Sequence, residues 1–354
     1  MNEVEIALQE RFLLQKEYFG NNKPVNQIVP LVSVTVATYQ HANYIKECLD
    51  GILMQKTDFP YEIILGEDGS TDGTQQICQE YAEKYPDKIR LFMRDRQLSQ
   101  YKGHDGKIIR FNGIWNRMSS RGKYIAWCEG DDYWIDPYKL QKQVDFLETH
   151  PDYGLVYTDV NFYFQKKDVM KFNYISSGKL KQAHDFKEHL VNAGYIAPCT
   201  WVYRREFLPK NIYQYVDGTF PIALDIWAQS KICFLNETTA VYRHLSESAS
   251  HSRSLQKGFH FTNGVFQIQK DYIKKYRSLI SETTEEKVYL SAYCRLLPAA
   301  IALKNGAFVK EALMYFKDKH IPYKMKLISS IYELAPLPMT LLFRFLYRMK
   351  GKDV

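Results

Sequence analysis

From residue 31 to residue 128 the sequence alternates short apolar runs with amphipathic segments. The apolar runs are rich in β-branched and aromatic residues, as expected for buried strands, and the segments between them carry apolar residues at helical spacing. The predicted strands cover 31–37, 61–65, 89–93 and 124–128, and the predicted helices cover 45–53, 77–85 and 108–118. This alternation predicts an α/β fold with a mostly parallel central sheet flanked by helices, which binds ligands at the carboxyl ends of its strands.

The strand Tyr124–Cys128 runs directly into an acidic loop. Glu129, Asp131 and Asp132 follow it with only one glycine among them. Because neighbouring carboxylates repel one another, this grouping favours a hard divalent cation with oxygen ligands, Mn²⁺ or Mg²⁺. The alternative is a solvated acidic turn before a helix capped by Asp136, and the three carboxylates alone do not decide between the two interpretations.

Unusual polar residues also follow the first two strands. Thr38 and Tyr39 come after the first strand, and Glu67 and Asp68 come after the second. Since the carboxyl ends of parallel strands share one edge of a sheet, we expect these residues to converge with the acidic loop. A nucleotide then fits between them, with Asp68 accepting hydrogen bonds from the ribose or base and the cation neutralising the diphosphate.

Further strands and helices are predicted downstream of the acidic loop. We expect a helix over 138–149, strands over 153–160, 199–203, 232–235 and 239–242, and helices beyond residue 260. A single acid, Asp225, lies within an apolar segment, where a helix cap is the alternative to a chemical role. Arg243 and His244 follow the last strand in a polar loop that is placed to contact phosphate, although a structural arginine and a surface histidine are equally compatible with the sequence.

Composition excludes several classes of protein. A chain with 45% hydrophobic and 25% charged residues is typical of a folded globular protein. We find no run of roughly 20 uncharged apolar residues and no secretion signal, so we expect a cytoplasmic protein. We expect no nucleic-acid partner. The six cysteines include no Cys-x-x-Cys pair, which argues against a zinc site or a disulfide framework.

The C-terminal tail carries most of the positive charge. Residues 301–354 contain ten Lys or Arg residues against four acids, within a net charge of +7 for the whole chain. Two apolar helical faces are predicted there, Phe308, Ala312, Leu313 and Phe316, and then Met339, Leu342, Phe343 and Leu346. These helices either pack on the rest of the protein or bind an anionic membrane, which would place the protein peripherally on the inner face of the cell membrane.

Four motifs in order resemble the family 2 glycosyltransferases, including bacterial capsule, O-antigen and surface polysaccharide enzymes. The resemblance spans roughly residues 30–245, and its motifs are Ala37-Thr38-Tyr39-Gln40, Glu67 to Thr74, Glu129-Gly130-Asp131-Asp132, and Asp225. Departures from the family pattern are Glu67 and Glu129, which replace aspartates, and Leu224, which stands where a glycine often precedes the base.

The resemblance implies a GT-A (Rossmann-like) fold and an inverting, metal-dependent hexosyltransferase. Such an enzyme moves a sugar from a nucleotide diphosphate donor, most often a UDP-sugar, to an acceptor hydroxyl on a lipid-linked or polysaccharide glycan. Asp225 would be the base, and Asp131, then Asp132, the metal ligands, with Glu129 left open. Thr38, Tyr39, Glu67, Asp68, Glu129, Asp131, Arg243 and His244 would bind the donor.

These expectations divide the chain into three segments. Residues 1–29 form an N-terminal helical extension, residues 30–255 a catalytic domain with a donor-binding half (30–160) and an acceptor-binding half (161–255), and residues 256–354 a basic helical region. One alternative function is a non-catalytic nucleotide- or carbohydrate-binding module. A sugar-1-phosphate nucleotidyltransferase fits less well, because it would place a glycine- and arginine-rich loop where this chain has Thr38-Tyr39-Gln40-His41.

Overall fold

A computed structural model describes residues 3–102, 108–180, 182–193, 196–208, 215, 217–245, 254–317 and 319–354. The chain divides into two compact units. The α/β unit contains Met1–Gln182, Tyr195–Gln214 and Asp225–His244, and the helical unit contains Ala183–Gly194, Tyr215–Leu224 and Leu245–Val354. This division differs from the three sequence-based segments, because the N-terminal helix groups with the sheet and two short segments before residue 225 group with the C-terminal helices.

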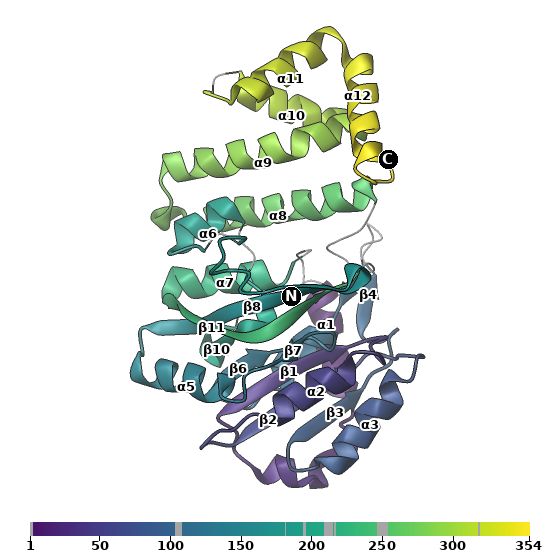
Figure 1. The fold of residues 1–354 in the computed structure, drawn as a ribbon, viewed down its shortest axis with the longest axis vertical. Helices are drawn as coiled ribbons and strands as arrows, with labels where there is room; N and C mark the ends of the chain where they lie inside the picture. The colour runs from purple at the N-terminus through teal and green to yellow at the C-terminus, as the bar shows by residue number, and fades with distance from the viewer. Residues whose placement is uncertain are drawn as a thin grey trace. The chain divides into compact units, whose positions relative to one another are not determined.

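The described residues of the α/β unit form a nine-stranded mixed sheet (Figure 1). Its order is β3-β2-β1-β6-β10-β8-β11-β7, with β9 paired to β8. The first four of these strands are mutually parallel, so the predicted α/β class is confirmed. The strands are β1 (Val32–Thr38), β2 (Tyr61–Glu67), β3 (Ile89–Met93), β6 (Tyr124–Trp127), β7 (Tyr133–Trp134), β8 (Tyr153–Phe164), β9 (Val169–Lys171), β10 (Val202–Arg204) and β11 (Lys231–His244).

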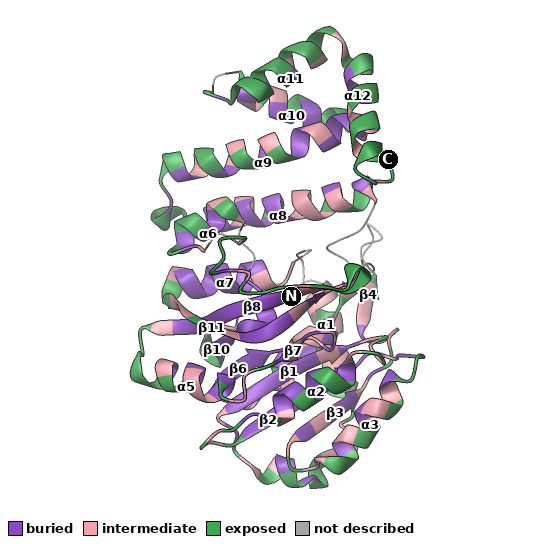
Figure 2. Cartoon of the chain, in the orientation of Figure 1, coloured by how far each residue is buried: buried purple, intermediate pink, exposed green. Residues whose placement is uncertain are grey.

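Five α-helices accompany this sheet in the described part of the unit. They are α1 (Glu3–Leu14), α2 (Ile45–Leu53), α3 (Thr74–Lys84), α4 (Asn112–Ser119) and α5 (Lys139–Thr149). Short 3₁₀ turns are η1 (Gly20–Asn22), η2 (Pro24–Gln27), η3 (Gln165–Lys167), η4 (Pro198–Thr200) and η5 (Arg205–Phe207). Helix α5 buries Leu140, Val144 and Leu147, whose spacing of four and three residues places them on one face. Strand β2 is buried along its whole length, as expected for a parallel strand covered on both faces (Figure 2).

The helix predicted over 108–118 is wrong in its first turn. Residues Ile108–Arg110 form strand β5, which pairs antiparallel with β4 (Gln100–Lys102), and α4 begins only at Asn112. The β-branched pair at 108 and 109 suits a strand, and its neighbours on β4 supply the hydrogen bonds that a helix would otherwise provide. Phe111 and Trp115 remain buried as predicted, against Leu8 of α1.

The two strands predicted over 232–235 and 239–242 are one long strand, β11. It pairs parallel with β8 and passes through irregularities in register between Leu235 and Ala240. The polar residues between the predicted strands therefore mark bulges and not a turn, because β8 is itself long enough to pair with both halves. The strand predicted over 199–203 is shorter than expected, since Pro198–Thr200 form a 3₁₀ turn before β10.

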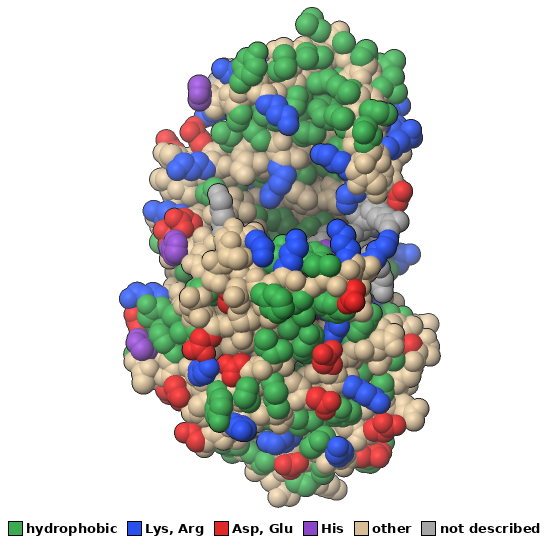
Figure 3. Space-filling model, in the orientation of Figure 1, with side chains coloured by type: hydrophobic (Ala, Val, Ile, Leu, Met, Phe, Trp, Pro, Cys, Tyr) green, Lys and Arg blue, Asp and Glu red, His purple; other side chains and the backbone are tan. Residues whose placement is uncertain are grey.

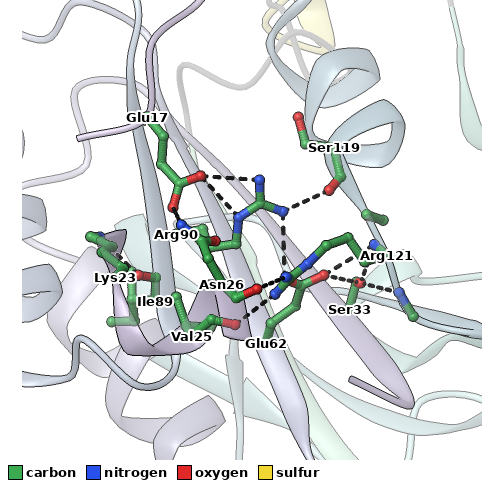
Figure 4. A network of polar contacts seen from close by, with 12 residues as sticks. Glu17, Lys23, Val25, Asn26, Ser33, Glu62, Ile89, Arg90, Ser119 and Arg121 are labelled. Atoms are coloured by element: carbon green, nitrogen blue, oxygen red, sulfur yellow. Dashed lines mark hydrogen bonds and ion pairs between the residues drawn. The ribbon is translucent and has the colours of Figure 1, made fainter. Parts of the chain in front are cut away.

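A polar network lies around the second residue of β2, away from the carboxyl ends of the strands (Figure 4). Glu62 is fully buried and accepts hydrogen bonds from Ser33 and from Arg121, whose Nη2 lies 2.6 Å from Glu62 Oε2. Arg121 also donates to the carbonyl groups of Val25 and Asn26. These bonds tie the N-terminal segment to the sheet, so that segment is part of the α/β unit.

The helical unit is built from short and long helices. They are α6 (Phe186–Asn192), α7 (Thr219–Gln229), α8 (Leu255–Lys275), α9 (Glu282–Ala302), α10 (Gly306–Phe316), α11 (Tyr323–Leu334) and α12 (Pro336–Met349), with the 3₁₀ turn η7 (Arg277–Leu279). Helix α7 begins in this unit, whereas Asp225 and the residues after it belong to the α/β unit. Aromatic rings join α8, α9 and α10, as in the contact of Phe266 with Tyr293 and of Tyr293 with Phe308. Among the described residues no helix is both long and apolar enough to span a bilayer.

The two predicted apolar faces of the tail have different outcomes. Phe308, Ala312 and Phe316 are buried as expected on α10. On α12, however, Met339 is buried while Leu342 and Leu346 are exposed. The face that packs is rotated from the predicted one, and the sequence pattern did not reveal this because both faces of α12 are apolar.

Candidate active site

The carboxyl ends of β2, β1 and β6 lie side by side, as predicted. Thr38 at the end of β1 is in register with Glu67 at the end of β2, and Thr35 is in register with Trp127 of β6. The loops that follow remain close, since the Asp68 N–H donates to the Thr38 carbonyl at 3.1 Å and the Gly130 N–H donates to the Ala37 carbonyl at 3.0 Å. Three segments distant in sequence therefore meet at one edge of the sheet, here called the carboxyl edge.

The loops after β1 and β2 are joined by reciprocal hydrogen bonds. The Gln40 side chain donates to Thr71 Oγ1 and accepts from the Thr71 N–H, while the Gln40 N–H donates to Ser70 Oγ. Asp72 accepts from the Ala42 N–H through one carboxylate oxygen and from Thr74 through the other. These contacts fix the first loop against the second, a role for Gln40 and Asp72 that sequence reasoning missed.

Glu67 faces its own loop. Its fully buried carboxylate accepts hydrogen bonds from the N–H groups of Gly69 and Ser70, the second at 2.8 Å. Gly69 has a φ of 74°, a conformation that glycine adopts without strain. Glu67 thus shapes the turn that presents Asp68, and in this structure it acts as a positioning residue.

Asp68 is buried between a hydroxyl group and a guanidinium group. One carboxylate oxygen accepts from Ser99 and the other forms an ion pair with Arg96. Burial raises the pKa of Asp68, although the hydrogen bond from Ser99 and the charge of Arg96 oppose this. The Arg96 guanidinium also lies 3.3 Å from the centre of the Tyr39 ring. Tyr39, Asp68 and Arg96 therefore form one cluster. Sequence reasoning missed Arg96, and the signal that indicates a basic residue near Asp68 is the pair Arg94 and Arg96 directly after β3.

The three acids after β6 have different surroundings. Glu129 accepts from Trp127 Nε1 at 2.6 Å, and desolvation, opposed by that hydrogen bond, raises its pKa to about 7. Asp132 is buried and accepts from the Arg243 N–H at 2.8 Å, and desolvation together with the charge of Asp131 raises its pKa. Within the described residues the Asp131 carboxylate makes no hydrogen bond or ion pair, and Asp131 is partly exposed. A fully solvated acidic turn is therefore excluded.

Two buried polar atoms beside Asp131 lack a partner among the described residues. They are Thr38 Oγ1 and His41 Nδ1. Both lie where a Cβ on Gly130 would approach to 2.7 and 2.8 Å, so only glycine lets the loops come this close. Burial lowers the pKa of His41, while the charge of Asp131 opposes this. Because buried polar atoms are nearly always hydrogen-bonded, this arrangement favours a polar ligand or water between the loops.

Arg243 is held within the protein. Its Nε donates to the Asp131 carbonyl at 2.8 Å, its Nη2 pairs with Glu47, and the rings of Tyr44 and Tyr133 lie 5.0 Å from the guanidinium. These contacts position the acidic loop and leave a phosphate-binding role for Arg243 without geometric support in this structure. The His244 ring lies against Phe164, with ring centres 5.0 Å apart.

Asp225 lies in the interior of α7 and not at a helix end. Its side chain is buried, and its neighbours in the helix, Leu224 and Ile226, are buried and apolar. The helix cap is Asp217, whose carboxylate accepts from the N–H groups of Thr219 and Phe220. The alternative of a capping role for Asp225 is therefore wrong.

The acidic loop is compatible with a divalent cation. Among the described residues no three His, Cys, Asp or Glu side chains are arranged to hold a metal ion by themselves. Mg²⁺ and similar ions are commonly bound by one or two carboxylates together with substrate phosphates and water. Asp131 fits this mode because its carboxylate makes no hydrogen bond or ion pair within the described residues. The Asp132 carboxylate, in contrast, already accepts a hydrogen bond from the Arg243 N–H.

Comparison with known proteins identifies the family. Residues 33–211 match the family described as Glycosyl transferase family 2. The chain belongs to glycosyl transferase family 2. This confirms the resemblance to the family; three of its four motifs lie within the matched residues, and Asp225 lies beyond them. An uncharacterized protein of Mycobacterium tuberculosis is 33% identical over 226 residues, which cover 62% of this chain and 61% of that protein. The chain thus spans about three-fifths of the length of this relative.

Solved structures of similar fold support the GT-A assignment for this family 2 chain. The S. aureus protein TarS, residues 1–349, in complex with UDP-GlcNAc has a TM-score of 0.52 at 15% identity, covering 91% of this chain and 92% of that one. The mannosyltransferase PcManGT from Pyrobaculum calidifontis, in complex with GDP-Man and Mn²⁺, has a TM-score of 0.52 at 17% identity, covering 98% and 95%. At these identities the likeness establishes the fold alone.

Proposed function

We propose that this chain is an inverting, metal-dependent glycosyltransferase. It would move a sugar from a UDP-linked donor to an acceptor hydroxyl on a lipid-linked or polysaccharide glycan. The observation that carries this proposal is the meeting of Tyr39, Asp68 and Asp131 at the carboxyl edge, beside two buried polar atoms without partners. Membership of glycosyl transferase family 2 supports the reaction class.

The donor nucleotide is assigned to the cluster of Tyr39, Asp68 and Arg96. An aromatic ring next to a carboxylate suits a base and a ribose, because the ring stacks on a planar base and the carboxylate accepts hydrogen bonds. In this structure the Arg96 guanidinium lies over the Tyr39 ring, so a base that stacked on the same face would displace it. The similar structures contain a uridine and a guanosine nucleotide sugar, and both support a nucleotide-sugar donor.

The diphosphate is assigned to the side of Asp131. A bound Mn²⁺ or Mg²⁺ would stabilise the negative charge that develops on the departing diphosphate. The side chain of Asp131 is the first choice as its ligand, and Asp132 is the second because the Arg243 N–H already engages its carboxylate. Glu67 and Arg243 would hold the two loops in place through the hydrogen bonds described above.

Asp225 is assigned as the general base. In the proposed reaction the acceptor oxygen bonds to the anomeric carbon as the bond from that carbon to the diphosphate oxygen breaks, and the acceptor proton passes to Asp225. Inversion requires the acceptor to enter from the face opposite the leaving group, so the base has to stand on the acceptor side of the sugar. This assignment is supported by the match of Asp225 to the fourth motif of the resemblance and by its place in the α/β unit, which also contains the acidic loop.

A binding experiment tests the donor and metal assignments. In the full chain, Asp131→Ala should weaken Mn²⁺-dependent UDP binding by at least about tenfold, since even residues that only support metal ligands have effects of this size. The matched control is Asp145→Ala, which removes an exposed acid from α5. Calorimetry with UDP and GDP, with and without Mn²⁺, measures both the metal dependence and the base preference. Equal UDP affinity in the two variants would overturn the metal assignment, and binding of donor without any turnover would favour the non-catalytic alternative.

A further inference from the structure

The last two helices expose apolar side chains in continuous stripes. On α11 the exposed residues are four apart and then three apart, so they share one face. Tyr323 and Leu334, at the two ends of the stripe, are 80% and 87% exposed. Figure 3 shows hydrophobic side chains gathered over α11 and α12 with Lys and Arg side chains around them. The stripe on α11 consists of Tyr323, Leu327, Ile331 and Leu334.

Helix α12 has two apolar faces with different surroundings. One face contains Met339, which is buried, and packing on that side attaches the helix to α9 and α11. The other face is exposed to solvent although nearly every residue on it is apolar. That face consists of Leu337, Leu341, Leu342, Phe345, Leu346 and Met349. The exposed apolar residues of α11 and α12 together are here called the terminal surface.

The charges around the terminal surface are predominantly positive. Residues 334–352 contain no Asp or Glu, and Glu333 is the single acid in residues 319–352. Lys324 and Lys326 lie on α11 and are exposed, and Arg348 and Lys350 are exposed at the end of α12. The basic residues of 319–352 are Lys319, Lys324, Lys326, Arg344, Arg348, Lys350 and Lys352.

We propose that the terminal surface docks on an anionic lipid bilayer. Apolar side chains would enter the boundary between headgroups and acyl chains, while the surrounding Lys and Arg side chains would contact anionic headgroups. A second copy of this chain fits less well, because self-association through this surface would bring two sets of positive charges together. A partner with a basic surface is excluded for the same reason. This proposal does not depend on the sugar transferred or on the metal, so it stands or falls separately from the proposed function.

Vesicle sedimentation with the full chain tests this docking. The protein should pellet with vesicles of phosphatidylglycerol and phosphatidylcholine at low salt, and it should pellet weakly with phosphatidylcholine alone. The double variant Leu341→Ser/Phe345→Ser should reduce pelleting on the mixed vesicles by about tenfold or more, because it removes two side chains from the apolar face. Arg348→Glu/Lys350→Glu should reduce it similarly and remove most of its salt dependence.

Matched controls separate docking from unfolding. Phe172→Ser removes a phenylalanine that is 64% exposed in the α/β unit, against 59% for Phe345, and it should leave pelleting unchanged. Circular dichroism and thermal melting of each variant check that the fold persists. Equal pelleting of Leu341→Ser/Phe345→Ser and Phe172→Ser would overturn the proposal. So would a stable dimer in sedimentation velocity that becomes monomeric in Leu341→Ser/Phe345→Ser without any vesicle binding by the parent chain, since a second copy would then cover the surface.

Discussion

Among the described residues, buried charged side chains occur only in the α/β unit, whereas exposed apolar side chains occur in both units and gather on α11 and α12 in the helical unit. The α/β unit buries charged residues in its interior, among them Glu62, Glu67, Asp68 and Asp132. In the described part of the helical unit no Asp, Glu, Lys or Arg is buried, and ten large apolar residues on α11 and α12 are exposed. Buried charges need specific partners, whereas the hydrophobic effect is non-directional and depends on the apolar area buried. The α/β unit is therefore suited to fix a site, and the helical unit is suited to present a surface.

The largest expected effect is on turnover, and it tests whether a buried acid of the α/β unit takes part in the reaction or only supports the fold. Asp225→Asn should lower turnover by about 10²- to 10⁴-fold, because positioned general bases typically contribute that much, while donor affinity stays unchanged. The control is Asp217→Asn, which keeps a good capping residue at the start of the same helix. Steady-state transfer assays and UDP calorimetry measure the two quantities. Loss of donor binding in Asp225→Asn would mean that Asp225 supports the fold of the site.

The next effect is on stability, and it tests whether the buried charge network holds the α/β unit. Arg121→Ala should lower the free energy of unfolding by about 3 kcal/mol, because Glu62 would lose its closest cationic partner while remaining buried. Lys123→Ala, which breaks the exposed pair with Glu148, should cost less than about 1 kcal/mol. Denaturant titration measures both. If the two variants cost the same, the buried network is no stronger than a surface pair.

Hydrogen exchange can place that effect in one unit. In Arg121→Ala the amides of β1, β2 and β6 should lose protection, whereas those of α8 and α9 should keep theirs. Loss of protection in both units together would show that they unfold cooperatively. The comparison between the units would then apply to composition but not to stability.

The smallest expected effect, taken over the two pH units from 6.5 to 4.5, concerns acid and the helical unit. His189 is buried against Phe220, and burial lowers its pKa to about 3 from an ordinary value of 6.5. Since the unfolded chain binds the proton between these pH values and the folded chain does not, stability should fall as the pH falls below 6.5, by up to about 1.4 kcal/mol per pH unit.

A histidine substitution isolates that contribution. His189→Leu should flatten the acid dependence of α8 and α9 hydrogen exchange between pH 6.5 and 4.5, whereas His260→Leu, at an exposed position on α8, should leave it as it is. Unchanged acid dependence in His189→Leu would show that other groups control the response of the helical unit to acid. A loss of stability on acidification that was confined to the α/β unit would show that acid destabilises that unit and not the helical unit.

Much of the candidate site could be predicted from the sequence because it depends on connectivity. Tyr39, Asp68 and Asp131 each follow a strand in the parallel part of the sheet, so the loops that carry them share one edge. The contacts of Arg96 and Ser99 with Asp68 could not be predicted, because they depend on how the segment after β3 folds back. The same holds for Glu67, whose carboxylate is turned to its own loop by hydrogen bonds to Gly69 and Ser70.

The sequence by itself determined the α/β class, the family and the convergence of the loops after β1, β2 and β6 at the carboxyl edge, because alternating apolar periodicity and glycine-containing loops act locally. Only the tertiary structure decided which carboxylates accept hydrogen bonds. The Asp132 carboxylate accepts one from the Arg243 N–H, which lies on a strand more than one hundred residues away in the sequence. The tertiary structure also decided which apolar face of α12 packs and which is exposed. Both faces satisfy the same helical spacing, and packing against α9 and α11 selects between them.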